Sequence, residues 1–502
     1  MFAPSGIRWD REVEVVVVGY GLAGAVAAIT ARDKGTSVVI LEKQSANSHH
    51  SNSSMSGGFF LLSSDVNGTI EHMKALSQVG ESTLWTDLET LRAWAEYVAQ
   101  NKDWLENLGG KAKFFSKEVE HPQLPGADSL ELWQYVSKGW GMMQFMYKQI
   151  AARQIDVWYE TRTQRLLTNE KGEVIGVRAS KISNGRQNEV NIKARKAVIL
   201  CSGGFEGNEE MKLQYLRVHP VYFTGTLENT GDGIIMAQEV GADLWHMNCC
   251  SGRLVPKFAD FPISFTIDFR DRVPGKQAPR APGGKVEAGT IIVDKYGERY
   301  MKEDLRSHAG FYRVTAYDSN RLEYPSVPSY YIFDRRRMDL RPLVLMSGAA
   351  GPHQLCKWSK DNKAELQKGW IVSGNTIAEL ASRNGIPEKT LEKTVRKWNK
   401  HCEEGKDSEF GRNPKHLVSL DRPPFFSVIL FPGGPNTQGG PRRNSRAQVV
   451  NPFGDPIPGL YAAGECGSIY GMLYPATGGN LAECIAFGRI AAENAVCEGE
   501  KA

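Results

Sequence analysis

The sequence contains no cysteine pair at the spacing of a redox motif, a haem attachment site or a zinc site. Its eight cysteines are scattered, and neither CxxC nor CxxCH occurs among the 502 residues. Thiols distributed in this way are typical of a reducing compartment rather than of a disulfide framework or a metal cluster. The adjacent Cys249 and Cys250 could form a redox pair, although buried structural thiols are commoner. We expect no metal ligand set, no haem and no iron–sulfur cluster.

The chain also lacks a large excess of charge of either sign. Its 61 basic and 57 acidic side chains leave a formal net charge of +4, which gives no support to a nucleic-acid partner. The apolar segment Val13–Ile29 is broken by glycines and is short for a membrane span. Acidic residues, among them Glu12 and Glu14, stand where a signal peptide carries positive charge. These features favour a cytoplasmic protein without an integral membrane segment.

The N-terminal part of the chain contains a complete dinucleotide-binding pattern. The β-branched run Glu14–Val18 leads into the GxGxxG motif at Gly19–Gly24, and the alanine-rich segment Ala25–Asp33 predicts the helix that follows. The second predicted strand, Ser37–Leu41, ends at Glu42. A strand, glycine turn, helix, strand and terminal acid within about 30 residues are far more specific than an isolated glycine motif.

Each part of this pattern has a physical role. Gly19 permits a tight turn, Gly21 lets the backbone approach a pyrophosphate, and Gly24 lets the helix pack closely on the strand. The helix N-terminus faces the phosphate charge, and Glu42 accepts hydrogen bonds from ribose hydroxyls. This unit alone leaves open whether the dinucleotide is FAD or a nicotinamide cofactor.

A second strand-to-helix element near the C-terminus favours FAD. The predicted strand Ile457–Ala463 ends at Gly464-Glu465, and Gly478-Gly479-Asn480 opens the predicted helix Leu481–Glu493. This element resembles the second FAD-binding element of two-dinucleotide-binding flavoproteins. The resemblance implies that Glu465 contacts the ribityl-pyrophosphate region and that the backbone of Asn480 and Leu481 lies near the pyrimidine edge of the flavin. There the helix dipole favours the anionic reduced flavin.

Further motifs lie between these two elements in a characteristic order. They are the polar loop Ser53–Phe59, the turn at Ala197–Phe205, the helix start at Thr230–Gly233 and the stretch Ile292–Glu303. Together they resemble the soluble, single-chain branch of the fumarate reductase/succinate dehydrogenase flavoprotein superfamily over nearly the whole chain. The resemblance implies an α/β fold, with a Rossmann-like FAD-binding domain that is interrupted by an inserted α+β cap.

The resemblance also implies a domain division and a set of cofactor contacts. We expect the FAD-binding domain to comprise residues 1–245 and 427–502, and the substrate-binding cap to comprise residues 246–426. FAD is expected to be noncovalent, because His49 and His50 do not match the position of the flavin-linked histidine in covalent relatives. Ser53 or Ser54 is expected near the dimethylbenzene edge instead. The cofactor-binding residues it implies are Gly19, Gly21, Leu22, Ala23, Gly24, Glu42, Lys43, Ser53, Ser54, Ser56, Gly57, Gly58, Ser202, Gly203, Gly204, Asp232, Gly464, Glu465, Gly479, Asn480 and Leu481.

The substrate-binding motifs depart from those of the dicarboxylate members. Asn436 stands where those enzymes carry a histidine, and Ala476 stands where they carry an arginine. A site without these two donors cannot offset the desolvation of two buried carboxylates. Fumarate and succinate are therefore not the expected substrates.

The segment Tyr474–Gly479 instead resembles the YPGPGG segment of 3-ketosteroid dehydrogenases. The resemblance implies that the Tyr474 hydroxyl and the Gly478 amide polarise a substrate ketone as an oxyanion hole. It also implies Arg306 as the proton donor, with Tyr312 and His308 in reserve. A simpler alternative is that Arg306 pairs with the nearby Glu303 on one helical face.

These observations predict an FAD-dependent oxidoreductase that acts on CH–CH bonds. We expect it to reduce or form the C=C bond of an apolar α,β-unsaturated ketone, 3-oxosteroid-like, by hydride transfer via flavin N5. One alternative is a reductase of a small unsaturated monocarboxylic acid bound by Arg306, and another is an electron carrier without a substrate. Because no second complete GxGxxG unit is visible, a separate protein or diffusible carrier is expected to exchange the electrons.

Overall fold

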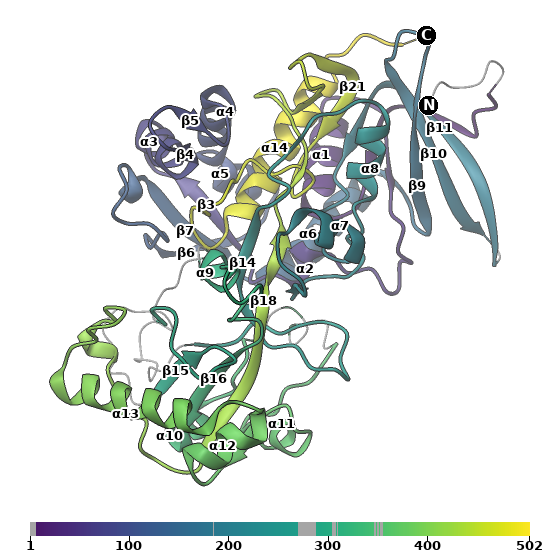
Figure 1. Cartoon of the computed structure of the whole chain (residues 1–502). Helices are drawn as coiled ribbons and strands as arrows, with labels where there is room; N and C mark the ends of the chain where they lie inside the picture. The colour runs from purple at the N-terminus through teal and green to yellow at the C-terminus, as the bar shows by residue number, and fades with distance from the viewer. Residues whose placement is uncertain are drawn as a thin grey trace. The chain divides into compact units, whose positions relative to one another are not determined.

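The computed structural model (Figure 1) describes residues 7–183, 185–269, 288–303, 308, 310–345, 348, 351 and 355–501. The chain divides into two compact units. The first comprises Met1–Leu216, Gly225–Ser251 and Asn436–Ala502, and the second comprises Arg217–Thr224 and Gly252–Pro435. The role of the second unit as a cap over a substrate stays a prediction.

The first unit is built on a largely parallel sheet. Its strand order is β20-β21-β11-β1-β2-β8, and all neighbours are parallel except the pair β20–β21. Two further strands, β10 and β9, extend β11 as an antiparallel meander. The strands are β1 (Arg11–Val18), β2 (Val38–Leu41), β8 (Asp156–Trp158), β9 (Thr161–Thr168), β10 (Val174–Ser183), β11 (Arg186–Leu200), β20 (Gln448–Val450) and β21 (Pro456–Ala462).

Two helices rich in small residues pack together in this unit. α1 (Leu22–Asp33) and α14 (Gly479–Ala495) are buried over most of their length. A Cβ added at Gly488 of α14 would lie 3.0 Å from the backbone oxygen of Ala23 on α1. The glycine therefore allows a close helix approach. α1 follows β1 and α14 follows β21, and both strands belong to the parallel part of the sheet. The carboxyl ends of parallel strands meet at one edge of a sheet, so we look for the candidate site in the segments that lead into these two helices.

The first unit also contains smaller sheets and further helices. A three-stranded antiparallel sheet has the order β3-β7-β6, β4 and β5 form a small hairpin-like pair, and β13 pairs antiparallel with the distant β19. These strands are β3 (Phe59–Ser63), β4 (Gln78–Val79), β5 (Thr83–Leu84), β6 (Ala112–Ser116), β7 (Leu130–Tyr135), β13 (Leu244–Trp245) and β19 (Gly440–Pro441). The helices are α2 (Asn52–Met55), α3 (Val66–Ser77), α4 (Leu88–Val98), α5 (Asn101–Asn107), α6 (Lys138–Ala152), α7 (Glu209–Tyr215) and α8 (Asp232–Glu239).

The second unit contains a six-stranded mixed sheet centred on β18 (Phe425–Thr437). β16 and β17 pair with β18 antiparallel, β12 pairs with it parallel, and β15 pairs antiparallel with β16. The other strands are β12 (Tyr222–Phe223), β14 (Cys250–Val255), β15 (Thr290–Val293), β16 (Ser329–Asp334) and β17 (Val372–Gly374). The helices are α9 (Gly310–Val314), α10 (Arg335–Leu340), α11 (Lys363–Gln367), α12 (Ile377–Asn384) and α13 (Glu388–Glu404).

Aromatic side chains form much of the core of the second unit. The rings of Phe258 and Trp370 are stacked, with centroids 4.4 Å apart and planes 4° apart. Phe265 and Trp358 pack beside them, with ring centroids 5.3 Å apart. All four side chains are buried. They therefore stabilise this unit as its own core.

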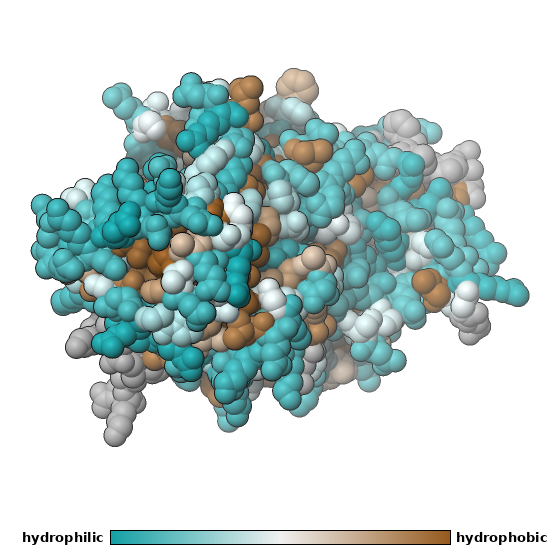
Figure 2. Space-filling view, turned by 60° about the horizontal axis from the view of Figure 1, so that its bottom comes forward, coloured by the Kyte–Doolittle hydropathy of each residue, from teal (hydrophilic) through white to brown (hydrophobic). Residues whose placement is uncertain are grey.

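Polar side chains cover most of the face seen in Figure 2, with apolar side chains exposed between them. The two most exposed large apolar residues, Phe453 at 90% and Leu322 at 74%, belong to different units. None of the helices in the described part of the chain combines the length and the apolar character needed to cross a membrane.

Candidate functional site

The turn between β1 and α1 is built so that only glycine fits. Gly19 has a φ of +101°, and a Cβ added there would lie 2.4 Å from the backbone oxygen of Cys201 at the end of β11. A Cβ added at Gly24 would lie 2.0 Å from the backbone oxygen of Gly19. Side chains at either position would push α1 away from the two strands. The glycine motif therefore keeps the helix N-terminus close to the sheet edge.

The N-terminus of α1 is open to an anion. Gly21 is its N-cap and, as a glycine, has no side chain that could cap the helix. The amide of Leu22 donates to Ser53 Oγ over 3.2 Å. The first turn contains no acidic residue, so the positive end of the helix dipole is not neutralised locally. This donor set fits a pyrophosphate, as the sequence predicts.

Glu42, which follows β2, is held as an acceptor. Its carboxyl oxygens accept from the backbone amides of Tyr20 at 3.0 Å and Gln44 at 2.8 Å, and His49 Nε2 lies 3.5 Å away. Burial disfavours the charged form, but these contacts outweigh it and hold the pKa of Glu42 below its ordinary value. An ionised carboxylate suits the predicted contact with ribose hydroxyls. His49 also contacts Tyr147, so its ring is engaged at this end of the pocket.

These elements surround one pocket of the first unit. The predicted cofactor residues that line it are Gly19, Gly21, Leu22, Ala23, Glu42, Lys43, Ser53, Ser202, Gly203, Asp232 and Glu465. Residues that the sequence reasoning missed also line it, among them Asn52, Thr161, Arg162, Glu228 and Asn229. They come from loops, from the start of α2 and from β9, where no local motif marks them. The pocket and its donors fit FAD, whose contacts with individual residues stay predictions.

Several predicted residues of the Ser53–Gly58 loop shape the backbone instead of lining the pocket. Ser54 forms a reciprocal capping box with Ser51 at the start of α2. Ser56 Oγ donates to the backbone oxygen of Ser53 at 2.7 Å and accepts from the amide of Gly58 at 3.1 Å. Gly58 has a φ of +68°, and a Cβ there would lie 2.3 Å from the backbone of Lys138. These residues support Ser53.

Asp232 connects the start of α8 to two cations. Lys43 Nζ lies 3.0 Å and Arg162 Nη2 lies 2.7 Å from its carboxyl oxygens. Burial opposes the charged form of Asp232, but both cations together hold its pKa below the ordinary value. Its carboxylate is therefore already charge-balanced by protein groups at the edge of the pocket.

The start of α14 places Tyr474 beside the helix N-terminus. The Tyr474 hydroxyl oxygen accepts the backbone N–H of Asn480 at 2.7 Å, and the side chain is buried. Gly478, the N-cap of α14, has a φ of +97°, and a Cβ there would lie 2.9 Å from the backbone of Phe59 and Phe60. Tyr470 donates to the backbone oxygen of Gly479 at 2.7 Å. The two tyrosines thus brace this turn.

Neutral side chains form a hydrogen-bonded network at the same helix start. Asn480 Nδ2 donates to Asn436 Oδ1 at 2.6 Å and to Ser251 Oγ at 3.1 Å. Asn436 Nδ2 donates to the backbone oxygen of Thr437 at 2.6 Å, and Gln438 Nε2 lies 3.1 Å from Asn480 Oδ1. Asn436, at the position of the relatives' histidine, is therefore engaged with protein groups.

The predicted proton-transfer residues belong to the second unit. Arg306 lies outside the described residues, and its pairing with Glu303 stays a prediction. Both oxygens of Glu303 accept from Arg299 at 2.7 Å. Tyr312 lies on α9. His308 is buried, and its Nε2 lies 2.6 Å from Nη2 of Arg253. Since an arginine can only donate, this nitrogen of His308 accepts.

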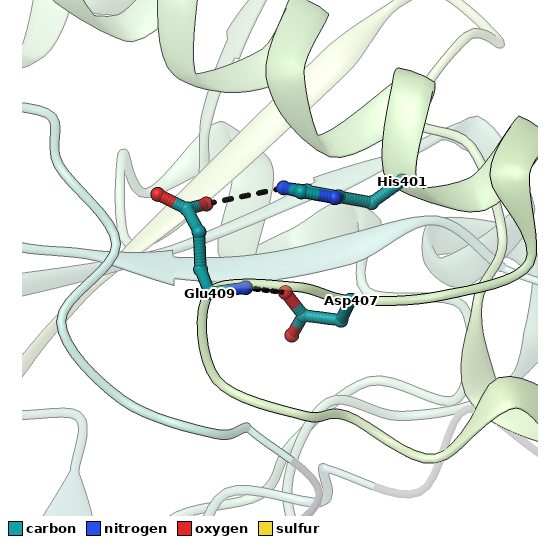
Figure 3. Close-up of side chains that lie close together, drawn as sticks. All are labelled: His401, Asp407 and Glu409. Atoms are coloured by element: carbon teal, nitrogen blue, oxygen red, sulfur yellow. Dashed lines mark hydrogen bonds and ion pairs between the residues drawn. The ribbon is translucent and has the colours of Figure 1, made fainter.

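A second group of titratable residues lies in the same unit (Figure 3). His401, Asp407 and Glu409 offer ligand atoms within 4.8 Å of one another. However, Asp407 lies 2.9 Å from a guanidinium nitrogen of Arg299, and Glu409 pairs with Lys397 Nζ. The charge of both acids is thus balanced by the protein, and the group is an ion-pair network.

A model of the protein family described as "FAD binding domain" matches residues 14–481 of the chain. This chain belongs to that family. The match includes both the β1–α1–β2 unit and the start of α14, so the two elements that favoured FAD are parts of one family pattern.

Curated relatives are similar over much of the chain. It is 26% identical to "Probable fumarate reductase Ifc3" of Shewanella frigidimarina, over 97% of this chain and 75% of that protein. It is 30% identical to a 3-oxosteroid 1-dehydrogenase of Mycolicibacterium smegmatis, over 64% of this chain and 56% of that enzyme. Among solved structures, the 3-ketosteroid Δ1-dehydrogenase of Sterolibacterium denitrificans in complex with 1,4-androstadiene-3,17-dione matches with a TM-score of 0.80 and 21% identity, covering 97% of this chain and 99% of that one.

These comparisons confirm the superfamily, the α/β fold and the cofactor that the sequence predicted. FAD is the cofactor, and the chain is an FAD-dependent oxidoreductase of the group that acts on CH–CH bonds. Its relatives include both a fumarate reductase and a steroid dehydrogenase, so the substrate has to be argued from the residues of this chain.

Proposed function

We propose that this chain reduces or forms the C=C bond of an apolar α,β-unsaturated ketone, with 3-oxosteroids as the best-fitting class. The observation that carries the proposal is the position of Tyr474 at the N-terminus of α14. Its oxygen accepts the N–H of Asn480 at 2.7 Å. FAD, when bound, supplies the hydride-transfer chemistry of this family.

The role of Tyr474 follows from the charge that develops on the substrate. Transfer of a hydride to or from the β-carbon of an enone builds negative charge on the ketone oxygen. A hydroxyl whose oxygen already accepts a hydrogen bond is a stronger donor, because such bonds polarise one another. The Gly478 amide and the positive end of the α14 dipole favour the same charge. Together they act as an oxyanion hole for the enolate.

The neutral network at α14 supports a ketone rather than a dicarboxylate. Asn436 and Ala476 replace the histidine and arginine of the dicarboxylate members, and Asn436 is used in contacts with Asn480 and Thr437. Ala476 is only 1% exposed and offers no donor from its side chain. A single polarised carbonyl needs less compensation on burial than two carboxylates do.

The proposal also includes a proton donor, an electron partner and a cellular location. Arg306 protonates the α-carbon of the substrate or relays the proton, with Tyr312 and His308 as alternatives. A separate protein or a diffusible carrier exchanges electrons with the chain. The eight scattered cysteines support a reducing, cytoplasmic location. The noncovalent state of FAD belongs to this proposal as well.

The test is anaerobic reoxidation of the dithionite-reduced protein by 4-androstene-3,17-dione, followed by flavin absorbance. We expect rapid reoxidation in the unaltered protein and a 10²- to 10³-fold slower rate in Tyr474→Phe, the usual loss for one oxyanion donor. Tyr97→Phe is the matched control, because its hydroxyl contacts Glu493 at the other end of α14. An equal rate in Tyr474→Phe would contradict the oxyanion role.

The competing function is reduction of a small unsaturated monocarboxylic acid, which the likeness to a fumarate reductase favours. Reoxidation by cinnamate, with none by the steroid, would replace the enone with a carboxylate held by Arg306. Slow reoxidation by both compounds, together with rapid exchange with a one-electron carrier, would indicate an electron carrier instead.

A further inference from the structure

We propose that Glu206 and Glu465 share one proton in the folded protein, and that FAD binds to the pair only while this proton is held. The proposal concerns the binding of oxidised FAD and is independent of the substrate. It assigns Glu206, which lies outside every predicted motif role, as a positioning residue of the cofactor site.

The two carboxyl groups meet beside Gly204, although they come from distant segments. Glu465 follows β21 and lines the pocket, whereas Glu206 follows the turn after β11 and is 0% exposed. A Cβ added at Gly204 would lie 2.4 Å from Glu465 Oε1 and 3.2 Å from Glu206 Oε2. Asn52 Nδ2 lies 3.0 Å from Glu465 Oε2 and 3.5 Å from Glu206 Oε1. One amide therefore bridges both acids.

The other partners of this pair are neutral as well. The Thr437 amide donates to Glu206 Oε1 at 2.9 Å, and the Thr437 hydroxyl donates to Glu465 Oε1 at 3.3 Å. Asn229 Nδ2 lies 3.5 Å from Glu465 Oε2. Within the described part of the chain, neither carboxyl group forms an ion pair with a lysine, arginine or histidine. Two ionised carboxylates at this place would have no compensating charge.

One atom shows where the shared proton belongs. Glu206 Oε2 is fully buried, and among the described residues it has no hydrogen-bond donor. The Glu465 carboxyl group lies nearby, since a Cβ added at Gly204 would contact both Glu206 Oε2 and Glu465 Oε1. A proton between the two groups supplies the missing hydrogen bond and removes one of two like charges. In agreement, burial raises the pKa of Glu206, and burial together with the charge of Glu206 raises the pKa of Glu465 well above its usual range.

The link to FAD follows from charge. The pyrophosphate of FAD is anionic, and Glu465 faces the pocket that receives it. A pair that has lost its proton presents a second negative charge to the cofactor, and bound FAD also removes water from Glu465. Both effects favour the protonated pair. Binding therefore takes up a proton once the free pair has lost it, and the affinity falls as the pH rises through its pKa.

The other titratable groups near the pair differ from it in the direction of their pKa shifts or can be tested by substitution. Burial raises the pKa of the nearby Cys250 and Cys484 thiols well above their ordinary value, so both stay neutral. Glu42 stays ionised, because its pKa is lowered. His49 and His50 also line the pocket and are the groups that could imitate the effect.

The experiment measures FAD binding to the apoprotein between pH 6 and pH 9 by flavin fluorescence quenching. Calorimetry in two buffers of different ionisation enthalpy counts the protons taken up. We expect Kd to rise about tenfold per pH unit above the pKa of the pair, the slope for one proton. In Glu206→Gln an amide N–H replaces the shared proton, so Kd at pH 6 stays within about threefold of the unaltered value and the slope disappears. Glu210→Gln, on the exposed side of α7, is the matched control and keeps the slope.

Two results would overturn the proposal. One is no proton uptake and no pH dependence in the unaltered protein, which needs no variant to fold. The other is a slope that survives in Glu206→Gln but disappears in His49→Gln or His50→Gln. Because no substrate is present, either result leaves the enone proposal intact, and failure of steroid turnover leaves this one intact.

Discussion

The molecule contains two groups of buried acids whose electrostatic surroundings are opposite. In the second unit, Asp407 and Glu303 lie 2.9 Å and 2.7 Å from guanidinium nitrogens of Arg299. In the first unit, the hydrogen-bond donors to Glu206 and Glu465 among the described residues are amides and a hydroxyl. The pKa of Asp407 is accordingly held well below its ordinary range, whereas the pKa of Glu465 is raised well above it.

The difference shows that burial alone does not determine whether a carboxyl group stays ionised or holds a proton. Arg299 packs over Trp398 with its guanidinium carbon 4.7 Å from the ring centroid, so cation, acids and aromatic ring form one closed network. Arg412 and Lys397 lie next to the other acids of this network, so its charges are balanced within the protein, and we expect its role to be structural. No cation of the described residues pairs with the acids beside the FAD pocket, so we expect these acids to respond to protons and to the cofactor. The predictions below test this contrast, from the largest expected effect to the smallest.

Arg299→Met is expected to have the largest effect. It leaves Asp407 and Glu303 buried without their main cation, and removal of one partner of a buried ion pair costs about 3–5 kcal/mol. Urea unfolding, followed by tryptophan fluorescence, measures the loss. Arg321→Met, which removes an arginine with a side chain 46% exposed, is the control and should change stability little. A loss below about 1 kcal/mol for Arg299→Met would show that the network is not structural.

Acid should break the same network through Asp407. Its pKa is lower in the folded chain than in the unfolded chain, because Arg299 stabilises the carboxylate against the opposing effect of burial. This stabilisation is complete above the unfolded pKa of about 3.9 and is lost as the pH falls toward the folded pKa. Thermal unfolding between pH 6 and pH 2.5 should show Tm falling below about pH 4. Asp407→Asn should start from a lower Tm and show a shallower fall.

Asn52→Ala tests the second group of acids, Glu206 and Glu465, through the amide that contacts both of them. It removes the amide that contacts Glu465 and Glu206, and also the acceptor for the Thr226 amide at 2.8 Å. Loss of such buried hydrogen bonds costs about 1–3 kcal/mol, which predicts FAD affinity about 10-fold weaker. Fluorescence titration with FAD measures it. Asn188→Ala, on the exposed part of β11, should bind FAD normally, and equal binding by both variants would argue against the bridge.

Asp339→Asn should have the smallest effect. Asp339 pairs with Arg335 one helical turn away at 2.6 Å, but both side chains are more than half exposed. Exposed pairs of this kind contribute about 0.5 kcal/mol or less. Urea unfolding in 0.1 M and 1 M salt checks the value. A loss comparable to that of Arg299→Met would show that burial does not distinguish the two kinds of ion pair.

The parts of the site that the sequence predicted are those in which neighbouring residues determine the geometry. The predicted strand Ser37–Leu41 corresponds to β2 (Val38–Leu41), and the predicted helix Leu481–Glu493 lies within α14. α1 begins three residues earlier than predicted, at Leu22, because the glycine turn is tight enough for the helix to start inside the motif. Local patterning was sufficient for these elements, since glycine spacing and β-branched runs restrict the backbone directly.

The contacts that the sequence could not predict join distant segments. Lys43 and Arg162 meet at Asp232, Asn52 reaches Glu465, and Thr437 reaches Glu206. No spacing rule connects these residues, because their proximity depends on the order of strands in the sheet. Ser54 also has a local role that the sequence analysis missed, since it forms a capping box with Ser51 at the start of α2. Its position near the flavin stays a prediction.

The sequence by itself determined the dinucleotide-binding turn, the acid after β2, the glycine start of α14 and, through them, FAD as the cofactor. These features depend on short-range sterics and on backbone groups that any fold of this pattern presents. Only the tertiary structure decided which buried acids receive a cation and which must share a proton. The partners of each acid come from segments that are distant in the sequence and that the sheet brings together. The residues next to each acid in the sequence therefore do not predict which partner it has.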